Sequence, residues 1–217
     1  MTYTGDVTVG GDPHVRELAH LVVTKMAVGP MSNNVYLLRC RETGEQLMVD
    51  AAFDDDRLLE LAGAAGLATV VTTHRHADHV QALPDVVEAT GATTVAGDAD
   101  ADELPVPVDV RVTDGDTVAV GRCTLSVIHL VGHTPGSIAL RYDDPAGHPH
   151  LFTGDSLFPG GVGRTGSPQD FTSLLDDVER KVFAVLPDET WVYPGHGADT
   201  TLGTERPSLP EWRDRGW

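Results

Sequence analysis

Short apolar runs separated by amphipathic stretches organise the first half of the chain. The runs are rich in β-branched residues and bounded by turn residues, which is typical of strands. They cover residues 21–25, 35–40, 46–50, 68–72 and 93–96. Between residues 54 and 66 the apolar positions recur at helical spacing, and Gly66 gives a stop signal. A second helix is expected over about residues 81–90, so this half is predicted to alternate strands and helices.

The second half has shorter and more closely spaced apolar runs. With Asp-Gly and Gly turns between them, these runs are typical of antiparallel meanders. The predicted strands cover residues 110–112, 117–120, 124–131, 138–142 and 151–153. A helix over residues 171–185 and a last strand over residues 190–193 follow. Two halves, each a sheet with helices on one side, predict an α/β fold in which two sheets stack face to face. No repeat or linker interrupts the chain, so we expect one domain over residues 1–217.

The composition is that of a soluble globular protein with a strongly acidic balance. Fifteen Lys and Arg stand against 33 Asp and Glu, which gives a net charge of −18. Such a field repels phosphate backbones and anionic lipid, so we expect no nucleic-acid partner and no membrane partner. The chain lacks the basic start of a signal peptide and any run of membrane-spanning length. Cys40 and Cys123 form no C-x-x-C pair and are expected to be buried, reduced thiols, which favours a cytoplasmic location.

One stretch concentrates metal-ligand chemistry where a strand gives way to a helix. It reads His74-x-His76-x-Asp78-His79, directly after the strand predicted to end at residue 72. Extended backbone puts His74 and His76 on the same side, and Asp78 and His79 follow where the chain turns. Neutral imidazole and carboxylate are the ligands that borderline divalent metals prefer. A solvated loop, or a helix-capping Asp78 with incidental histidines, is the alternative that this density of ligands disfavours.

Three more ligand-type residues lie on loops that follow predicted strands. His133 lies in VGHTPGS, Asp155 in LFTGDSLF and His196 in VYPGHG. Glycines beside them allow the backbone to approach closely. Four strand ends that deliver ligands to one edge of a sandwich predict a site for two metal ions.

These motifs, in this order, resemble the metallo-β-lactamase superfamily, from about Val22 to His196. The resemblance implies a four-layer αββα sandwich and two divalent metal ions, zinc in the first place, with iron or manganese as alternatives. It implies that one ion is bound by His74, His76 and His133. It implies that the other is bound by Asp78, His79 and His196, and that Asp155 bridges the two. The β-lactamases proper lack a bridging aspartate at that place, which argues against that branch.

Five further histidines are expected to be structural or solvent-facing: His14, His20, His129, His148 and His150. Asp50 ends the run QLMVD, at what is expected to be the same edge as the ligands. It either orients a histidine ligand through a hydrogen bond or forms a turn. The sequence leaves both interpretations open.

The ligand set favours hydrolysis. Two ions that share a water lower its pKa from 15.7 to about 7, which makes a metal-bridging hydroxide available near neutral pH. Ser137 and Ser156 lie near ligands, but no G-x-S-x-G elbow frames either, so no side-chain nucleophile is expected. Asp78 is expected to have a catalytic task besides ligation, because its free carboxylate oxygen would hold the hydroxide in line with the carbonyl carbon.

The segment FTGDSLFPGGVGRTG, followed by VYPGHG, looks like the glyoxalase II branch of the superfamily. That resemblance implies hydrolysis of a hydroxyacyl thioester, a small-molecule substrate. Full-length glyoxalase II enzymes carry a C-terminal helical domain that helps bind glutathione, and residues 197–217 are too few for such a domain. The chain resembles the short, single-domain bacterial members, and the thiol carrier is glutathione or another low-molecular-weight thiol.

Other activities of the same fold are alternatives. HRHADH also resembles persulfide dioxygenases, which hold one iron on two histidines and an aspartate, although those enzymes tend to close with Pro-Ala-His rather than Pro-Gly-His-Gly. A lactonase comes third, with Phe158 in place of the tyrosine of that family. The acidic charge disfavours a nuclease, and the complete ligand set disfavours a metal-binding module without catalysis.

Overall fold

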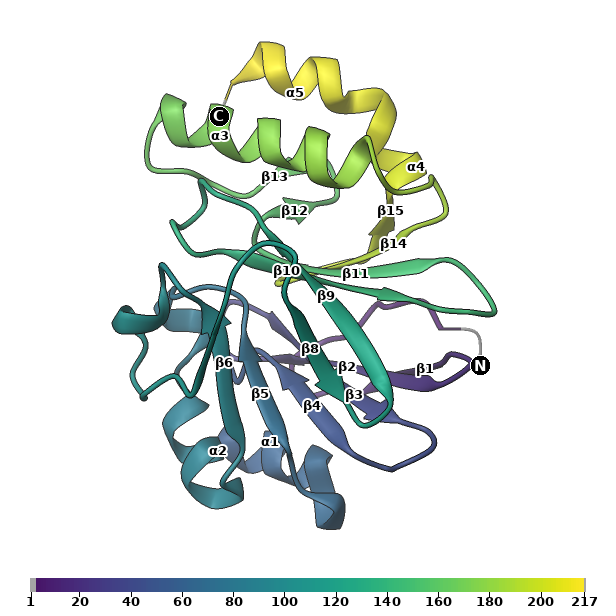
Figure 1. The fold of residues 1–217 in the computed structure, drawn as a ribbon, viewed down its shortest axis with the longest axis vertical. Helices are drawn as coiled ribbons and strands as arrows, with labels where there is room; N and C mark the ends of the chain where they lie inside the picture. The colour runs from purple at the N-terminus through teal and green to yellow at the C-terminus, as the bar shows by residue number, and fades with distance from the viewer. Residues whose placement is uncertain (1–2, 217) are drawn as a thin grey trace.

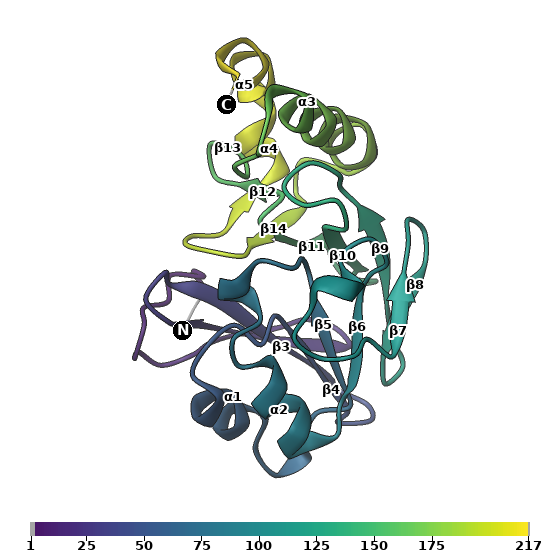
Figure 2. The same cartoon turned by 90° about the vertical axis from the view of Figure 1, so that its left-hand side faces the viewer.

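The structure is a computed structural model that describes residues 3–216. Figure 1 shows four layers: α1 and α2, a first sheet, a second sheet, and α3 with α4 and α5. The view turned by 90° shows the same order (Figure 2). The predicted αββα sandwich is therefore confirmed. Within the described residues, no helix is long and apolar enough to cross a membrane.

The first sheet has seven strands in the order β1-β2-β3-β4-β5-β6-β7. Strands β1 to β4 pair antiparallel, and β4 to β7 pair parallel. Their bounds are β1 His14–Glu17, β2 Leu21–Val28, β3 Asn33–Cys40, β4 Gln46–Val49, β5 Thr69–Thr72, β6 Thr93–Gly97 and β7 Val110–Val112. The first ligand motif follows β5, in the parallel part of this sheet. Parallel strands all end at the same edge of a sheet.

The second sheet has six strands in the order β15-β14-β11-β10-β9-β8, and β12 and β13 form a separate two-stranded sheet. Strands β8 to β11 form the predicted antiparallel meander, and β14 pairs parallel with β11. The bounds are β8 Thr117–Val120, β9 Cys123–His129, β10 Ile138–Asp143, β11 Pro149–Gly154, β12 Leu157–Phe158, β13 Gly161–Val162, β14 Trp191–Pro194 and β15 Thr200–Thr201.

The helices lie on the two outer faces (Figures 1 and 2). The α-helices are α1 Asp55–Ala62, α2 Leu83–Thr90, α3 Pro168–Asp177, α4 Leu202–Glu205 and α5 Leu209–Arg215. The 3-10 turns are η1 Gly63–Ala65, η2 Ala77–His79, η3 Ala101–Glu103 and η5 Arg206–Ser208, and η4 Val178–Phe183 is a π-helical turn. Helix α3 begins where the Ser167 hydroxyl accepts a hydrogen bond from the Asp170 amide, with Pro168 at the first position.

Three apolar cores separate the four layers. The central core lies between the sheets and includes Leu38, Val71 and Leu140. A second core packs the first sheet against α1 and α2, and a third packs the second sheet against α3, α4 and α5. These cores hold both sheets rigidly, so the loops at the strand ends start from fixed points.

The element boundaries differ from prediction in a few places. The strand Val110–Val112 was predicted to belong to the meander of the second half, but it pairs parallel with β6 in the first sheet. A run of three residues is too short to indicate its partner strand. The helix predicted over residues 171–185 begins three residues earlier, at its Ser167 cap, and closes as a π-helical turn. The short elements β1, β12, β13, β15, α4 and α5 were not predicted, since they are too short to show a period.

Candidate metal centre

Four loops at one edge of the sandwich carry the seven candidate ligands. One follows β5 and turns through η2, one joins β9 to β10, and the others follow β11 and β14. Backbone hydrogen bonds join these loops, since the Gly195 amide donates to Gly154 O at 2.8 Å and the Asn34 amide donates to Gly195 O at 2.7 Å. The structure thus brings together residues from positions 74 to 196 of the chain.

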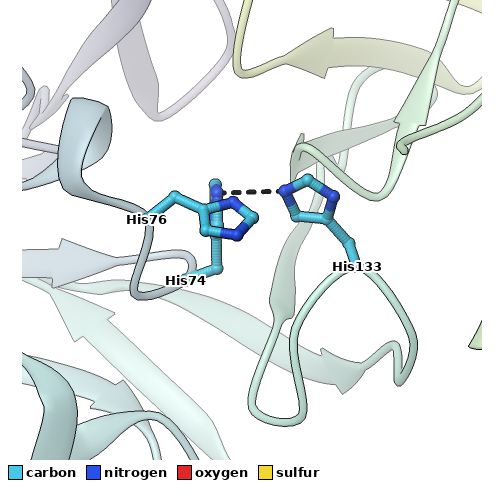
Figure 3. A group of neighbouring side chains, drawn as sticks. All are labelled: His74, His76 and His133. Carbon is cyan, nitrogen blue, oxygen red and sulfur yellow. Dashed lines mark hydrogen bonds between the residues drawn. The ribbon is translucent and has the colours of Figure 1, made fainter. Parts of the chain in front are cut away.

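His74, His76 and His133 form the first group of donors, with one ring nitrogen from each lying within 4.8 Å of the others. His74 Nε2 and His133 Nε2 are 3.2 Å apart. Figure 3 shows the three rings converging from the loop after β5 and the loop before β10. His74 is buried, whereas His76 is exposed. One side of this group is therefore open to solvent.

Asp78, His79 and His196 form the second group, also within 4.8 Å. His79 Nε2 lies 3.2 Å from His196 Nε2. Asp78 Oδ2 lies 3.3 Å from His196 Nε2 and 3.5 Å from His79 Nε2. The Asn33 side-chain amide donates to the same Asp78 oxygen at 2.9 Å, and after the opposing effect of burial this bond is the main cause of the lowered pKa of Asp78. Sequence reasoning did not find Asn33, because nothing at position 33 marks a contact with position 78.

Asp155 lies between the two groups. Its Oδ1 is 3.4 Å from His79 Nε2, and its Oδ2 is 3.6 Å from His133 Nε2 and 3.5 Å from His196 Nε2. Burial favours the neutral carboxyl, but His196, His79 and His74 outweigh it and lower the pKa of Asp155 well below its usual range. Oδ1 is buried and has no hydrogen bond of good geometry within residues 3–216. A buried carboxylate oxygen left in this way requires a cation or a donor.

The second ring nitrogen of four candidate ligands is held by an oxygen outside the centre. His79 Nδ1 lies 2.9 Å from Asp50 Oδ2, and His74 Nδ1 lies 3.0 Å from Thr73 Oγ1. His133 Nδ1 and His196 Nδ1 face the carbonyl oxygens of Arg164 and Met31, at 2.7 and 3.0 Å. Since these oxygens accept the Nδ1 proton, the Nε2 atom of each ring, when the ring is neutral, presents a lone pair to the centre.

Asp50 bonds His79 directly and is linked to His74 through Thr73, which supports the interpretation that it orients candidate ligands. Its Oδ2 accepts from His79 and, at 2.8 Å, from the Thr73 hydroxyl, whose oxygen faces His74 Nδ1. Its Oδ1 accepts from the Thr73 amide at 2.7 Å. Asp50 also has a φ of 59°, a strained value for a residue with a side chain. The contribution of Thr73 was missed, because a threonine at the end of a strand has many commoner roles.

The protonation pattern differs between the groups. Burial lowers the pKa of His74 and of His133, and neighbouring histidines add to this. Burial also opposes a charge on His79, but its contacts with Asp155 and Asp50 raise its pKa to about 10. Without metal, His79 therefore carries the positive charge that compensates these two carboxylates.

The donor set fits divalent metal ions. The His74 and His133 rings are both held neutral, and their Nε2 lone pairs 3.2 Å apart repel each other unless a cation lies between them. Tetrahedral coordination at 2.0–2.1 Å places ligand nitrogens about 3.3 Å apart. Nitrogen and carboxylate donors suit zinc, iron and manganese alike. The assignment of the seven residues as ligands stays a prediction, and the five other histidines lie outside both groups.

Comparison with known proteins points to the same superfamily that the sequence motifs resemble. The family model described as "Metallo-beta-lactamase superfamily" matches residues 28–196. A hydroxyacylglutathione hydrolase of Fuscovulum blasticum is 38% identical over 167 residues, which are 76% of this chain and 62% of that protein. The chain therefore spans less than two thirds of the length of this curated relative.

Two solved structures extend the comparison. The BLEG-1 B3 metallo-β-lactamase is 28% identical with a TM-score of 0.77, covering 87% of this chain and 98% of that chain. The protein TTHA1623, solved in a di-iron-bound form, is 32% identical with a TM-score of 0.72, covering 86% and 98%. Both alignments include nearly the whole of the compared chain.

Proposed function

The chain belongs to the metallo-β-lactamase superfamily, and we propose that it is a binuclear metal-dependent hydrolase that cleaves a hydroxyacyl thioester. The observation that carries the proposal is the position of Asp155. Its two oxygens face histidines of both donor groups, which is the geometry of a bridging ligand. The resemblance to hydroxyacylglutathione hydrolases supports the thioester as the substrate class.

The two ions would supply a nucleophile by lowering the pKa of a shared water, and would polarise the substrate carbonyl. His74, His76 and His133 would hold one ion, Asp78, His79 and His196 the other, and Asp155 would contact both. No serine is needed. The Ser137 hydroxyl is bonded to Thr134 at 2.6 Å, and the buried Ser156 hydroxyl has no hydrogen-bond partner within residues 3–216 and hence no base to activate it.

Asp78 is the residue to which we assign a catalytic role. Its Oδ2 faces His79 and His196 and is held by Asn33, so the carboxylate has one orientation. These three contacts all involve Oδ2 and not the other oxygen, Oδ1. We propose that Oδ1 accepts a proton of the attacking water and aligns its oxygen with the carbonyl carbon.

Two cavities beside the donor groups have the size of a small substrate. One, of about 310 Å³, is lined by His76, His133 and Thr134, among others. The other, of about 210 Å³, runs from Phe158 to Arg164, and the Phe158 ring centroid lies 6.4 Å from that of His196. We propose that the acyl and thiol parts occupy these two cavities. The thiol is glutathione or another small thiol, and neither nucleic acid nor a membrane is a partner of this acidic protein.

The test is a substrate panel with metal analysis of the same preparation. We expect two equivalents of metal and a kcat/KM for hydroxyacyl thioesters far above that for nitrocefin, lactones or phosphodiesters. Asp155→Ala should lose at least one equivalent and nearly all hydrolysis, whereas Asp85→Ala, at an exposed carboxylate, should lose neither. Oxygen consumption with glutathione persulfide at one iron per chain would instead establish the dioxygenase alternative. A kcat/KM for nitrocefin equal to that for thioesters would establish a β-lactamase.

A further inference from the structure

The two cysteines come together at the edge of the sandwich remote from the metal centre. Cys40 ends β3 in the first sheet, and Cys123 begins β9 in the second. The opposite end of β3 is Asn33, which contacts Asp78, so roughly 23 Å of strand separates Cys40 from the centre. Both side chains belong to the core between the sheets, and both thiols are free. Sequence spacing gave no sign of this pairing.

The two thiols lie close together, since both belong to the same core cluster, both line the same cavity, and the residue next to Cys123 bonds the Cys40 sulfur. The Cys123 thiol donates to His20 O at 3.4 Å, and the Arg122 amide donates to Cys40 Sγ at 3.5 Å. The turn before β9 packs tightly here, since a Cβ at Gly121 would lie 2.9 Å from Cys40 Sγ. The surrounding backbone therefore holds the Cys40 sulfur against the turn that leads into Cys123.

A cavity of about 350 Å³ gives access to the pair. It is lined by both cysteines and by polar groups that include Glu42, Arg122 and Tyr142. The exposed fraction is only 1% for Cys40 and 5% for Cys123. A small neutral molecule can reach the sulfur atoms through this cavity, whereas a folded protein cannot.

The surroundings make the two thiols unequal. Burial disfavours the Cys40 thiolate, but hydrogen bonds from the Thr43 side chain and from nearby backbone amides outweigh it and lower the pKa of Cys40 to about 6. Burial, with Cys40 as its neighbour, raises the pKa of Cys123 to about 11. At neutral pH the first is a thiolate and the second a thiol, which is the division between an attacking and a resolving cysteine.

We propose that Cys40 and Cys123 form a peroxide-reactive dithiol that closes to a disulfide between the two sheets. The Cys40 thiolate attacks one oxygen of hydrogen peroxide, the O–O bond breaks, and hydroxide leaves as the Cys40 sulfenic acid forms. Cys123 then attacks the Cys40 sulfur, the S–O bond breaks, and the sulfenic oxygen leaves as water with the Cys123 proton. The two thiols lose two electrons in total, and the peroxide gains them. The site is independent of the proposed hydrolysis.

The first test uses the wild-type holoenzyme. It is exposed to stoichiometric hydrogen peroxide, alkylated and mapped by mass spectrometry. We expect a Cys40–Cys123 linkage that dithiothreitol reverses. Without peroxide, alkylation by iodoacetamide should label Cys40 before Cys123, with a rate that rises through about pH 6. Absence of the linkage, with both thiols still alkylated after peroxide treatment, would overturn the proposal.

Two variants then separate the roles. In Cys123→Ala, the Cys40 sulfenic acid lacks its resolving thiol and should be trapped by dimedone. In Cys40→Ala, dimedone labelling of Cys123 should be at least tenfold weaker. Equal labelling in the two variants would refute the assignment of Cys40 as the attacking residue. The wild-type mapping decides whether the disulfide forms even if either variant folds poorly.

Discussion

At the scale of single residues, Asp78 has the most specific expected effect. Asp78→Asn keeps the shape of the side chain and its proximity to His196, but it removes a negative charge and an acceptor. Because misplacing a nucleophile by about 1 Å costs about 100-fold in rate, we expect kcat to fall at least that far even with two metal equivalents bound. Turnover of a hydroxyacyl thioester at saturating metal measures this. Asp85→Asn is the control, and full recovery of Asp78→Asn by added metal would reduce Asp78 to a ligand.

The residue scale also shows what a sequence can and cannot reveal. The seven candidate ligands could be predicted because histidine and aspartate are rare in such density, and their motifs resemble a known family. Asn33 and Thr73 could not be predicted, because asparagine and threonine are common at strand ends. Asn33 acts on Asp78, which is distant in the sequence, and Thr73 acts through Asp50. The approach of Cys40 to Cys123 was equally hidden, because it depends on how two sheets are stacked.

At the scale of elements, the glycine after β14 sets how closely two loops approach. A Cβ on Gly195 would overlap Asp155 Oδ1 and lie 2.8 Å from His79 Cε1. Gly195→Ala should therefore displace Asp155 and lower both metal content and turnover by about tenfold or more. Gly147→Ala is the control, since Gly147 is exposed and its Cβ would meet only the Asp144 side chain, at 3.2 Å. Metal analysis and kinetics on both variants test this, and equal behaviour would exclude a packing role for Gly195.

The element scale explains the successes and failures of the fold prediction. Strands such as β3 and β5 are largely buried and have apolar residues at their centres, so they could be predicted to within a few residues. Strand β1 alternates between half-buried and exposed positions over only four residues, which is too short a pattern to recognise. The parallel pairing of β7 with β6 is a property of the sheet and leaves no mark in three residues.

At the scale of the whole molecule, a buried histidine predicts sensitivity to acid. Burial, followed by the charges of Arg16 and His148, lowers the pKa of His150 to about 3. The unfolded chain takes up this proton below about pH 6.5, whereas the folded one does so only near pH 3. Stability should therefore fall with decreasing pH across that window, by up to about 1.4 kcal/mol per pH unit from this group.

Urea unfolding of demetallated protein between pH 7 and 4 measures the effect. In the wild-type protein His150 Nδ1 lies 2.9 Å from the Tyr193 hydroxyl. His150→Asn keeps a polar group there, and its free energy of unfolding should depend less steeply on pH. His20→Asn replaces an exposed histidine and serves as the control. An unchanged slope in His150→Asn would mean that other groups cause the acid sensitivity.

Metal removal should also affect the molecule as a whole, because each donor group draws on both sheets. His74 and His76 follow β5 in the first sheet, whereas His133 precedes β10 in the second, and His79 and His196 are divided in the same way. At a metal concentration of 100 times Kd, each ion should raise the Tm by roughly 5–10 °C. Calorimetry with and without a chelator tests this. An identical Tm would contradict metal binding across the sheets.

The same division between sheets sets an order of events during translation. His74 and His76 leave the ribosome well before His133, and His196 leaves later still. The loop of His196 is held by residues that are synthesised much earlier. The side chains of Asn34 and Tyr36 donate hydrogen bonds to Pro194 O, and that of Lys25 donates one to Gly197 O. A nascent chain that stalls before β14 can complete only the first donor group. Occupation of the second group therefore requires a chain that has been synthesised at least through His196.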